Sequence, residues 1–225
     1  MNKIVLLFIA SLMLISCAQS RNTDVKEVDV CVYGGTSAGV VAAYSAKMMG
    51  KSVLLIEPGK YLGGMTTGGL GSTDIGNKYA VTGLARLFYR RVGEHYGQFE
   101  QWMFPPSVAT KVMMRFIDDA QVEVLYQHRI VSAEKDGAKI VGIHVEHAAD
   151  KETASITVKA KQFIDCSYEG DLMAKSGVSY ATGREDCKLY GETLNVLLAS
   201  IPRWCRSLCG KRRLYQWILL GNQCQ

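Results

Sequence analysis

The feature that most constrains the fold is a succession of strand, glycine-rich loop, helix and strand near the start of the chain. Residues 28–33 (VDVCVY) form a short apolar run rich in valine, typical of a parallel strand buried on both faces. Small and apolar residues over 37–49 predict a helix that Gly50 ends, and residues 52–57 (SVLLIE) predict a second buried strand. This succession is a complete βαβ unit and predicts a Rossmann-like α/β fold.

The glycine-rich loop is a candidate site for a dinucleotide pyrophosphate, which needs backbone N–H groups at contact distance and the positive end of a helix. We expect Gly34 to make the tight turn, Gly35 to let the chain approach the phosphates and Gly39 to let the helix lie close to the strand. Thr36 stands where the common fingerprint has its second glycine, and its hydroxyl is available to donate to a phosphate oxygen. The candidate binding residues of this loop are Gly34, Gly35, Thr36, Ser37, Ala38 and Gly39.

Glu57 favours a dinucleotide site over a glycine turn with a structural role only. This acid ends the second strand, 23 residues after Gly34. In a dinucleotide-binding βαβ unit, an acid at that place binds the ribose hydroxyls. A glycine loop alone is a weak signal, whereas the loop together with both strands, the helix and the acid is a specific one.

Residues 29–71 resemble the N-terminal part of bacterial FAD-dependent oxidoreductases of the glutathione-reductase-like group. In that group the acid is followed by a GG-x-T/S loop that crosses the flavin phosphates. The resemblance therefore implies FAD as the cofactor. The residues that match this second loop are Gly63, Gly64, Met65 and Thr66.

A later stretch, residues 161–178 (KQFIDCSYEGDLMAKSGV), resembles the segment of the same group in which the chain returns to the flavin. The resemblance carries over two residues of this stretch, Gly170 and Asp171, and implies that Asp171 lies near the pyrophosphate and ribitol. The departures from the group's segment are Cys166, Ser167 and Tyr168, which replace alanine, threonine and, in many relatives, glycine.

The resemblance covers roughly residues 28–195 and implies a partial FAD-binding domain: a Rossmann-like βαβ unit with a β-meander, incomplete at its C-terminus. The meander strand around His128 to Val131 would pass the adenine, with Ile130 as a contact. An oxidoreductase acting on a small organic or carbohydrate-derived substrate is the implied function, and no catalytic residue is implied. Two alternatives are a truncated flavin- or dinucleotide-binding remnant without activity and a non-enzymatic surface lipoprotein of a carbohydrate-uptake system.

The sequence between the two motifs predicts two helices. Apolar residues recur with helical spacing between Tyr79 and Trp102. Two prolines then interrupt the pattern, and Ser107 is placed to cap a second helix that continues to Asp119.

Antiparallel strands are expected after these helices. The alternating run 121–134 predicts one strand, and the pair Asp136 and Gly137 predicts a hairpin turn from which residues 139–147 return. Residues 154–167 predict one or two further strands.

The first 17 residues predict a leader that is not part of the fold. A basic start and a short apolar run precede LISC, which resembles the lipobox of bacterial lipoproteins with Cys17 as the lipidated residue. We therefore expect an exported protein attached to a membrane through Cys17, with residues 18–27 as a spacer. A transmembrane anchor is the less favoured alternative, because the apolar run falls short of the roughly 20 residues of a spanning helix. An ordinary cleaved signal is the next alternative after the lipobox.

No metal site is expected. Cys31 and Cys166 lie in apolar strand-like runs, where a cysteine is most often a small buried hydrophobe. The pair Cys205 and Cys209 has no second pair or histidine nearby, and strand alternation places His144 and His147 on opposite faces. The spacing of the remaining cysteines fixes no disulfide pairing.

The tail, residues 196–225, differs in composition from the rest of the chain. The formal net charge is +5, and the five basic residues of this tail, which holds no acid, account for all of it. One reading is a gene translated out of frame after Asn195, which would leave a chain without turnover; a natural C-terminal helix is the alternative. A single KRR triplet does not predict a nucleic-acid partner.

Overall fold

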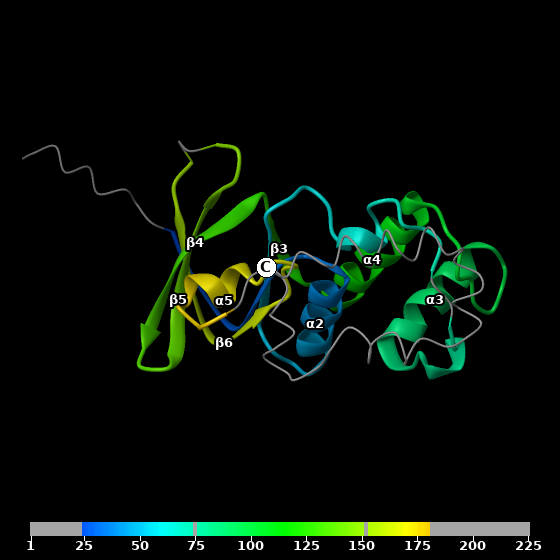
Figure 1. The fold of residues 1–225 in the computed structure, drawn as a ribbon, viewed down its shortest axis with the longest axis horizontal. Coiled ribbons are helices and arrows are strands. Elements are labelled where there is room, and N and C mark those ends of the chain that lie inside the picture. Colours follow the sequence, from blue (N-terminus) through cyan, green and yellow to red (C-terminus); the bar gives the residue numbers. More distant parts are fainter. Residues whose placement is uncertain (1–23, 74–75, 151–152, 181–225) are drawn as a thin grey trace, which may run out of the picture. The chain divides into compact units, whose positions relative to one another are not determined.

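One six-stranded sheet, in the order β3-β2-β1-β6-β5-β4, organises the part of the chain that the computed structural model describes, which is residues 24–73, 76–150 and 153–180 (Figure 1). The first four strands in this order, β3, β2, β1 and β6, are parallel to one another. The sheet then continues from β6 through β5 to β4 as an antiparallel meander. The strands are β1 (Asp24–Tyr33), β2 (Val53–Glu57), β3 (Glu123–Tyr126), β4 (His128–Asp136), β5 (Lys139–His147) and β6 (Ile156–Asp165).

The expected βαβ unit is present, with helix α2 (Ser37–Met48) between β1 and β2. Gly50 follows the helix with φ +76°, a left-handed conformation that glycine adopts without strain. Helix α4 (Pro106–Ala120) packs on α2, and α3 (Gly83–His95) packs on α4. One apolar core joins these helices to the sheet; it includes Val32, Val40, Leu55, Phe88, Val112 and Phe116.

The opposite face of the parallel strands is covered by the meander and by the short helix α5 (Asp171–Lys175). Alternate residues of β1 and β2, such as Cys31 and Leu54, face this second core because successive side chains of a strand point to opposite faces. Both faces are buried, which explains the nearly continuous apolar runs of β1 and β2. Within the second core, the Ile130 N–H donates to the Tyr33 hydroxyl oxygen at 3.2 Å.

We expected residues 18–27 to form a spacer, but strand β1 begins at Asp24, so residues 24–27 belong to the sheet. These residues pair with the first half of β6, where Asp24 lies opposite Ile156. The pairing depends on backbone hydrogen bonds to a distant strand, which a search for apolar runs does not detect.

The run 121–134 forms two strands rather than the one expected. Gln127 has φ +56°, and this left-handed residue separates β3, which is parallel to β2, from β4, which begins the meander. The Gln127 N–H donates to the Gly59 carbonyl oxygen at 3.0 Å, so the break is held against the loop that follows β2.

Three further local predictions concern the start of α4, the hairpin turn and the strands that follow it. Helix α4 begins at Pro106 after an N-cap at Pro105, so Ser107 does not cap it; proline is favoured in the first helical turn because its missing N–H has no partner there. The hairpin turn is confirmed, with Asp136 paired to Lys139 across Gly137. A single strand, β6, follows.

Several expectations concern parts of the chain that the structure does not describe. The leader 1–17 with Cys17 and the tail 196–225 lie outside the described residues. Among the described residues, no helix is both long enough and apolar enough to cross a membrane.

Candidate dinucleotide site

The candidate site lies at the carboxyl ends of β1 and β2, the edge of a parallel sheet where ligands of such folds bind. The glycine-rich loop leaves β1 there, and the Gly34 N–H donates to the Ile56 carbonyl oxygen of β2 at 2.8 Å. The first turn of α2 follows directly, with N–H groups that have no partner within the helix. This is the arrangement that binds phosphate.

Two glycines of the loop are required by close approach of the backbone. Gly34 has φ +93°, and a Cβ on it would lie 2.6 Å from the Ser167 backbone nitrogen. A Cβ on Gly39 would overlap the carbonyl oxygen of Gly34. Gly34 thus makes a tight turn after β1, and Gly39 lets α2 approach the backbone of that turn, where a close approach to the strand was expected. The binding of a cofactor by either residue stays a prediction.

Gly35 is restricted by protein neighbours. A Cβ on Gly35 would overlap Cδ2 of Leu62 and lie 2.8 Å from Oε2 of Glu57. The Gly35 N–H also donates to that same Glu57 oxygen at 2.6 Å. The approach of Gly35 to a phosphate stays a prediction.

Thr36 corrects one expectation. Its Oγ1 donates to the Cys166 carbonyl oxygen at 2.8 Å and accepts the Gly39 N–H at 3.3 Å, so Thr36 is the N-cap of α2. The side chain is buried. Because a hydroxyl has one proton to donate, it is not available to a phosphate oxygen. Thr36 instead joins the loop to the turn after β6.

Glu57 lies beside the loop, as its place at the end of β2 predicts. One carboxylate oxygen accepts the Gly35 N–H and the other accepts the Gly59 N–H, both at 2.6 Å. Each oxygen keeps a second lone pair, so the carboxylate can still accept hydrogen bonds from ribose hydroxyls.

The second glycine loop adjoins the first. Gly63 and Gly64 have φ +96° and +54°, and Met65 and Thr66 complete the short turn Gly64–Thr66. The Gly63 N–H donates to the Gly35 carbonyl oxygen at 2.7 Å. The structure thus places together two loops that the resemblance assigns to the flavin phosphates.

Tyr168 is the contact that sequence reasoning missed. Its hydroxyl oxygen accepts the Met65 N–H at 2.8 Å, and a Cβ on Gly64 would overlap this hydroxyl. Tyr168 therefore connects the later motif to the second glycine loop. The presence of tyrosine where many relatives have glycine was the feature of the sequence that could have indicated this contact.

The later motif is ordered by Asp165. This carboxylate accepts the Ser167 N–H and hydroxyl, at 3.0 and 2.7 Å, while Ser167 Oγ accepts the Asp171 N–H at 2.9 Å. Gly170 precedes α5 with φ +70°. Burial, together with Glu169 and Asp165, raises the pKa of Asp171. Its contact with a ribitol stays a prediction.

Ile130 is buried in the second core, and its N–H is committed to Tyr33. A contact of Ile130 with adenine therefore cannot use this N–H as the structure stands, and the contact itself stays a prediction. The neighbouring His128 is also buried: its Nδ1 lies 2.6 Å from the Tyr126 carbonyl oxygen, and its Nε2 has no hydrogen-bond partner among the described residues.

The remaining histidines of the meander contact neighbouring strands or the residues that follow β5. His144 lies between Thr157 and Glu134, at 2.9 and 2.6 Å. His147 accepts the Asp150 N–H through Nδ1 at 2.8 Å. Across the residues that the structure describes, no three His, Cys, Asp or Glu side chains form a group that could hold a metal ion.

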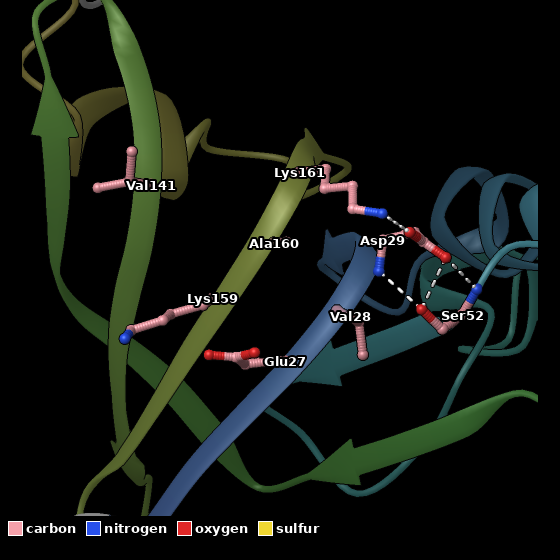
Figure 2. Close-up of a pocket in the computed structure, with 8 residues that line it drawn as sticks. All are labelled: Glu27, Val28, Asp29, Ser52, Val141, Lys159, Ala160 and Lys161. Carbon is pink, nitrogen blue, oxygen red and sulfur yellow. Dashed lines mark hydrogen bonds and ion pairs between the residues drawn. The ribbon is translucent and has the colours of Figure 1, made fainter.

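A polar hollow of about 370 Å³ lies at the other end of the sheet, where β2 begins (Figure 2). Asp29 accepts Lys161 Nζ at 2.7 Å and the Ser52 N–H and hydroxyl, both at 2.9 Å. These contacts hold the pKa of Asp29 well below its usual range. These contacts join β1, β6 and the start of β2, at the end of the sheet opposite to the glycine loops, so we assign them a structural role.

The fold is similar to those of solved flavoproteins. A flavoprotein/dehydrogenase from Cytophaga hutchinsonii matches with a TM-score of 0.53 at 17% identity, over 71% of this chain and 44% of that chain. The flavin-dependent brominase Bmp2 gives 0.51 at 19%, over 68% and 41%. The glycerol-3-phosphate dehydrogenase from Bacillus halodurans, complexed with FAD, gives 0.51 at 14%, over 67% and 36%.

The chain therefore spans less than half the length of each of these three structures. No curated protein matches the chain in sequence. The sequence model of a family described as FAD dependent oxidoreductase matches residues 29–216, which is most of the chain. The chain belongs to the FAD-dependent oxidoreductase family, whose cofactor is FAD.

Proposed function

We propose that this chain is the N-terminal, FAD-binding portion of an oxidoreductase that acts on a small organic or carbohydrate-derived substrate. The observation that carries the proposal is the meeting of both glycine loops and the later motif at one edge of the sheet. The Gly63 N–H reaches Gly35, and Thr36 reaches Cys166.

The residues present fit FAD, because the N–H groups in the first turn of α2 have no partner within the helix and each Glu57 carboxylate oxygen keeps a second lone pair. The first turn of α2, at Ser37 and Ala38, would hold the diphosphate, and Glu57 would accept the ribose hydroxyls. The turn Gly64–Thr66 and Asp171 would lie along the flavin side. When bound, the flavin supplies the capacity to accept a hydride or two electrons.

The protein's own contribution within this part of the chain is to bind and orient the cofactor. We assign no catalytic residue. Tyr168 fixes the second glycine loop through Met65, and Thr36 fixes the first through Cys166. Both contacts preform the site before the cofactor arrives, which lowers the ordering cost of binding.

We also propose export and attachment to a membrane through a lipidated Cys17, on the periplasmic or outer-membrane face. The support is the lipobox-like LISC after a basic and apolar start. Metabolic labelling of the expressed chain with a radioactive fatty acid tests this. The proposal requires label in the wild type and none in Cys17→Ala.

The two alternatives differ from the proposal in turnover. A flavin-binding remnant would take up FAD without passing electrons, and a non-enzymatic surface lipoprotein would bind glycans without FAD. Reconstitution of the full chain with FAD, followed by removal of free cofactor and an absorbance spectrum, separates the lipoprotein alternative from the other two. Substrate turnover by the reconstituted chain then separates the oxidoreductase from the remnant. We expect a yellow protein with flavin bands. A colourless protein would overturn the proposal, and glycan binding by it would favour the lipoprotein alternative.

A further inference from the structure

A second cavity, separate from the polar hollow, lies between α2 and α3 and has a volume of about 540 Å³. Both helices pack on α4, whose Met113 forms part of the lining. Small side chains on the facing helices, Ala42 and Ala85, leave the space open. The volume is within the range of pockets that bind small organic molecules.

The wall that α3 contributes is aromatic and held rigidly. Tyr89 stacks on Trp102 with ring centroids 3.9 Å apart, and Phe88 meets Phe104 edge to face at 5.3 Å. These contacts keep Phe88 and Tyr89 in place without a ligand. The cavity is therefore preformed on this side, and binding does not carry the entropic cost of ordering these two side chains.

The chemistry of the lining is apolar with a polar end. Of the described residues that line the cavity, none carries a charge. Hydroxyl groups come from Ser37 and Thr66 at one end, and the Tyr89 hydroxyl already accepts the Thr73 hydroxyl at 3.5 Å. A sugar ring in this cavity would leave most of its hydroxyls without partners, which is unfavourable. An aliphatic or aromatic group would be accommodated.

The polar end of the cavity is continuous with the candidate cofactor site. Ser37 belongs to the first turn of α2, and Thr66 belongs to the second glycine loop. From there the lining extends along α2 to Ala42, away from Glu57, where the ribose is proposed to bind. A guest in the cavity would thus adjoin the proposed sites of the diphosphate, at Ser37, and of the flavin side, at Thr66, without taking the place of the adenosine.

We propose that this cavity is the substrate pocket and that it takes an uncharged, mainly apolar organic molecule rather than a sugar. The assignment as a substrate pocket rests on the proposed function, whereas the chemical class of the guest rests on the lining alone. Of the two substrate classes in the proposed function, small organic and carbohydrate-derived molecules, only the first fits this lining.

The test uses N-phenyl-1-naphthylamine, a neutral apolar dye that fluoresces when bound, with the full 225-residue chain. We expect saturable binding and a loss of at least about tenfold in affinity in Ala85→Phe, because the larger side chain fills the mouth of the cavity. Ala85 is exposed, so the variant should fold. The matched control is Ala138→Phe, an exposed alanine of the β4–β5 turn, which should bind as the wild type does.

Four results would overturn the proposal: no dye binding by the wild type, unchanged binding by Ala85→Phe, displacement of the dye by maltose, or displacement by saturating FAD. The last would assign the cavity to the cofactor. Should Ala85→Phe not fold by circular dichroism, Leu84→Phe fills the same cavity and decides. FAD binding is measured separately on the same chain, so a failure of the proposed function is distinguishable from a failure of the pocket.

Discussion

The Thr36 hydroxyl donates to the carbonyl oxygen of Cys166 at 2.8 Å, across 130 residues of sequence. The Thr36 hydroxyl oxygen also accepts the Gly39 N–H, so one side chain both caps α2 and holds the later motif against the glycine loop. A residue that looks like a departure from the glycine fingerprint therefore has a structural role of its own.

Thr36→Val is expected to destabilise the fold by about 1 to 2 kcal/mol, because it removes the helix cap and leaves the carbonyl of the half-buried Cys166 without this donor. Urea unfolding followed by circular dichroism measures the change. Ser45→Ala is the control: its hydroxyl donates to the Val41 carbonyl within the same helix, and alanine is the better helix former. A Thr36→Val variant as stable as Ser45→Ala would contradict the assigned role.

Tyr168→Phe is expected to weaken FAD binding several-fold with little change in overall stability, because the Met65 N–H loses its partner and the second glycine loop loosens. Fluorescence titration with FAD gives the affinity, and hydrogen exchange at Met65 reports the loop itself. Tyr180→Phe is the matched control, since both tyrosines are 55% exposed. Equal exchange at Met65 in both variants would show that the bond does not hold the loop.

Asp29 should make the stability of the fold dependent on pH in the acid range. Its pKa is lowered in the folded state, first by Lys161 and then by Ser52. The stabilisation is therefore fully present above the ordinary carboxyl pKa of about 4 and is lost as the pH falls towards the lowered folded-state value.

Melting temperatures of the wild type and Asp29→Asn at a series of pH values check this. We expect the wild type to be more stable at pH 6 and the difference to shrink at pH 3. The Asp29 contacts lie partly exposed at the surface, so the difference should also fall with added salt. A gap that widens on acidification would have the wrong sign.

Cys31 is expected to resist thiol reagents in the native protein. The side chain is fully buried, and burial raises its pKa to about 12, so almost no thiolate is present at neutral pH. Alkylation by iodoacetamide followed by mass spectrometry should leave Cys31 unmodified until urea is added. Modification of Cys31 before unfolding would indicate an open core.

The βαβ unit and its acid could be predicted because their signals are local. Apolar runs, Gly50 after the helix and the spacing of Glu57 all lie within one stretch of sequence. Side-chain contacts between distant segments could not be predicted. Thr36 meets Cys166 and Met65 meets Tyr168 only once β6 lies beside β1.

The meander was harder to predict in detail than the glycine loops. Nothing in the alternation of 121–134 marks Gln127, a non-glycine residue with φ +56°, as the break between two strands. The break depends on the Gly59 carbonyl, which accepts the Gln127 N–H. Likewise, the Ile130 N–H donates to the hydroxyl of Tyr33, a residue of β1 that lies 97 positions earlier in the sequence.

The central claim is that the glycine loop holds FAD, and Gly39→Ala tests it with a single added methyl group. That methyl would overlap the Gly34 carbonyl oxygen, whereas the same group on Gly76 meets no atom of the described residues within 4 Å, which makes Gly76→Ala the matched control. Titration of each purified chain with FAD, followed by flavin fluorescence, is the measurement. We predict binding of one FAD per chain by the wild type and Gly76→Ala and a loss of at least about a hundredfold in affinity in a folded Gly39→Ala; equal affinity in all three, or no binding by the wild type, would contradict the account.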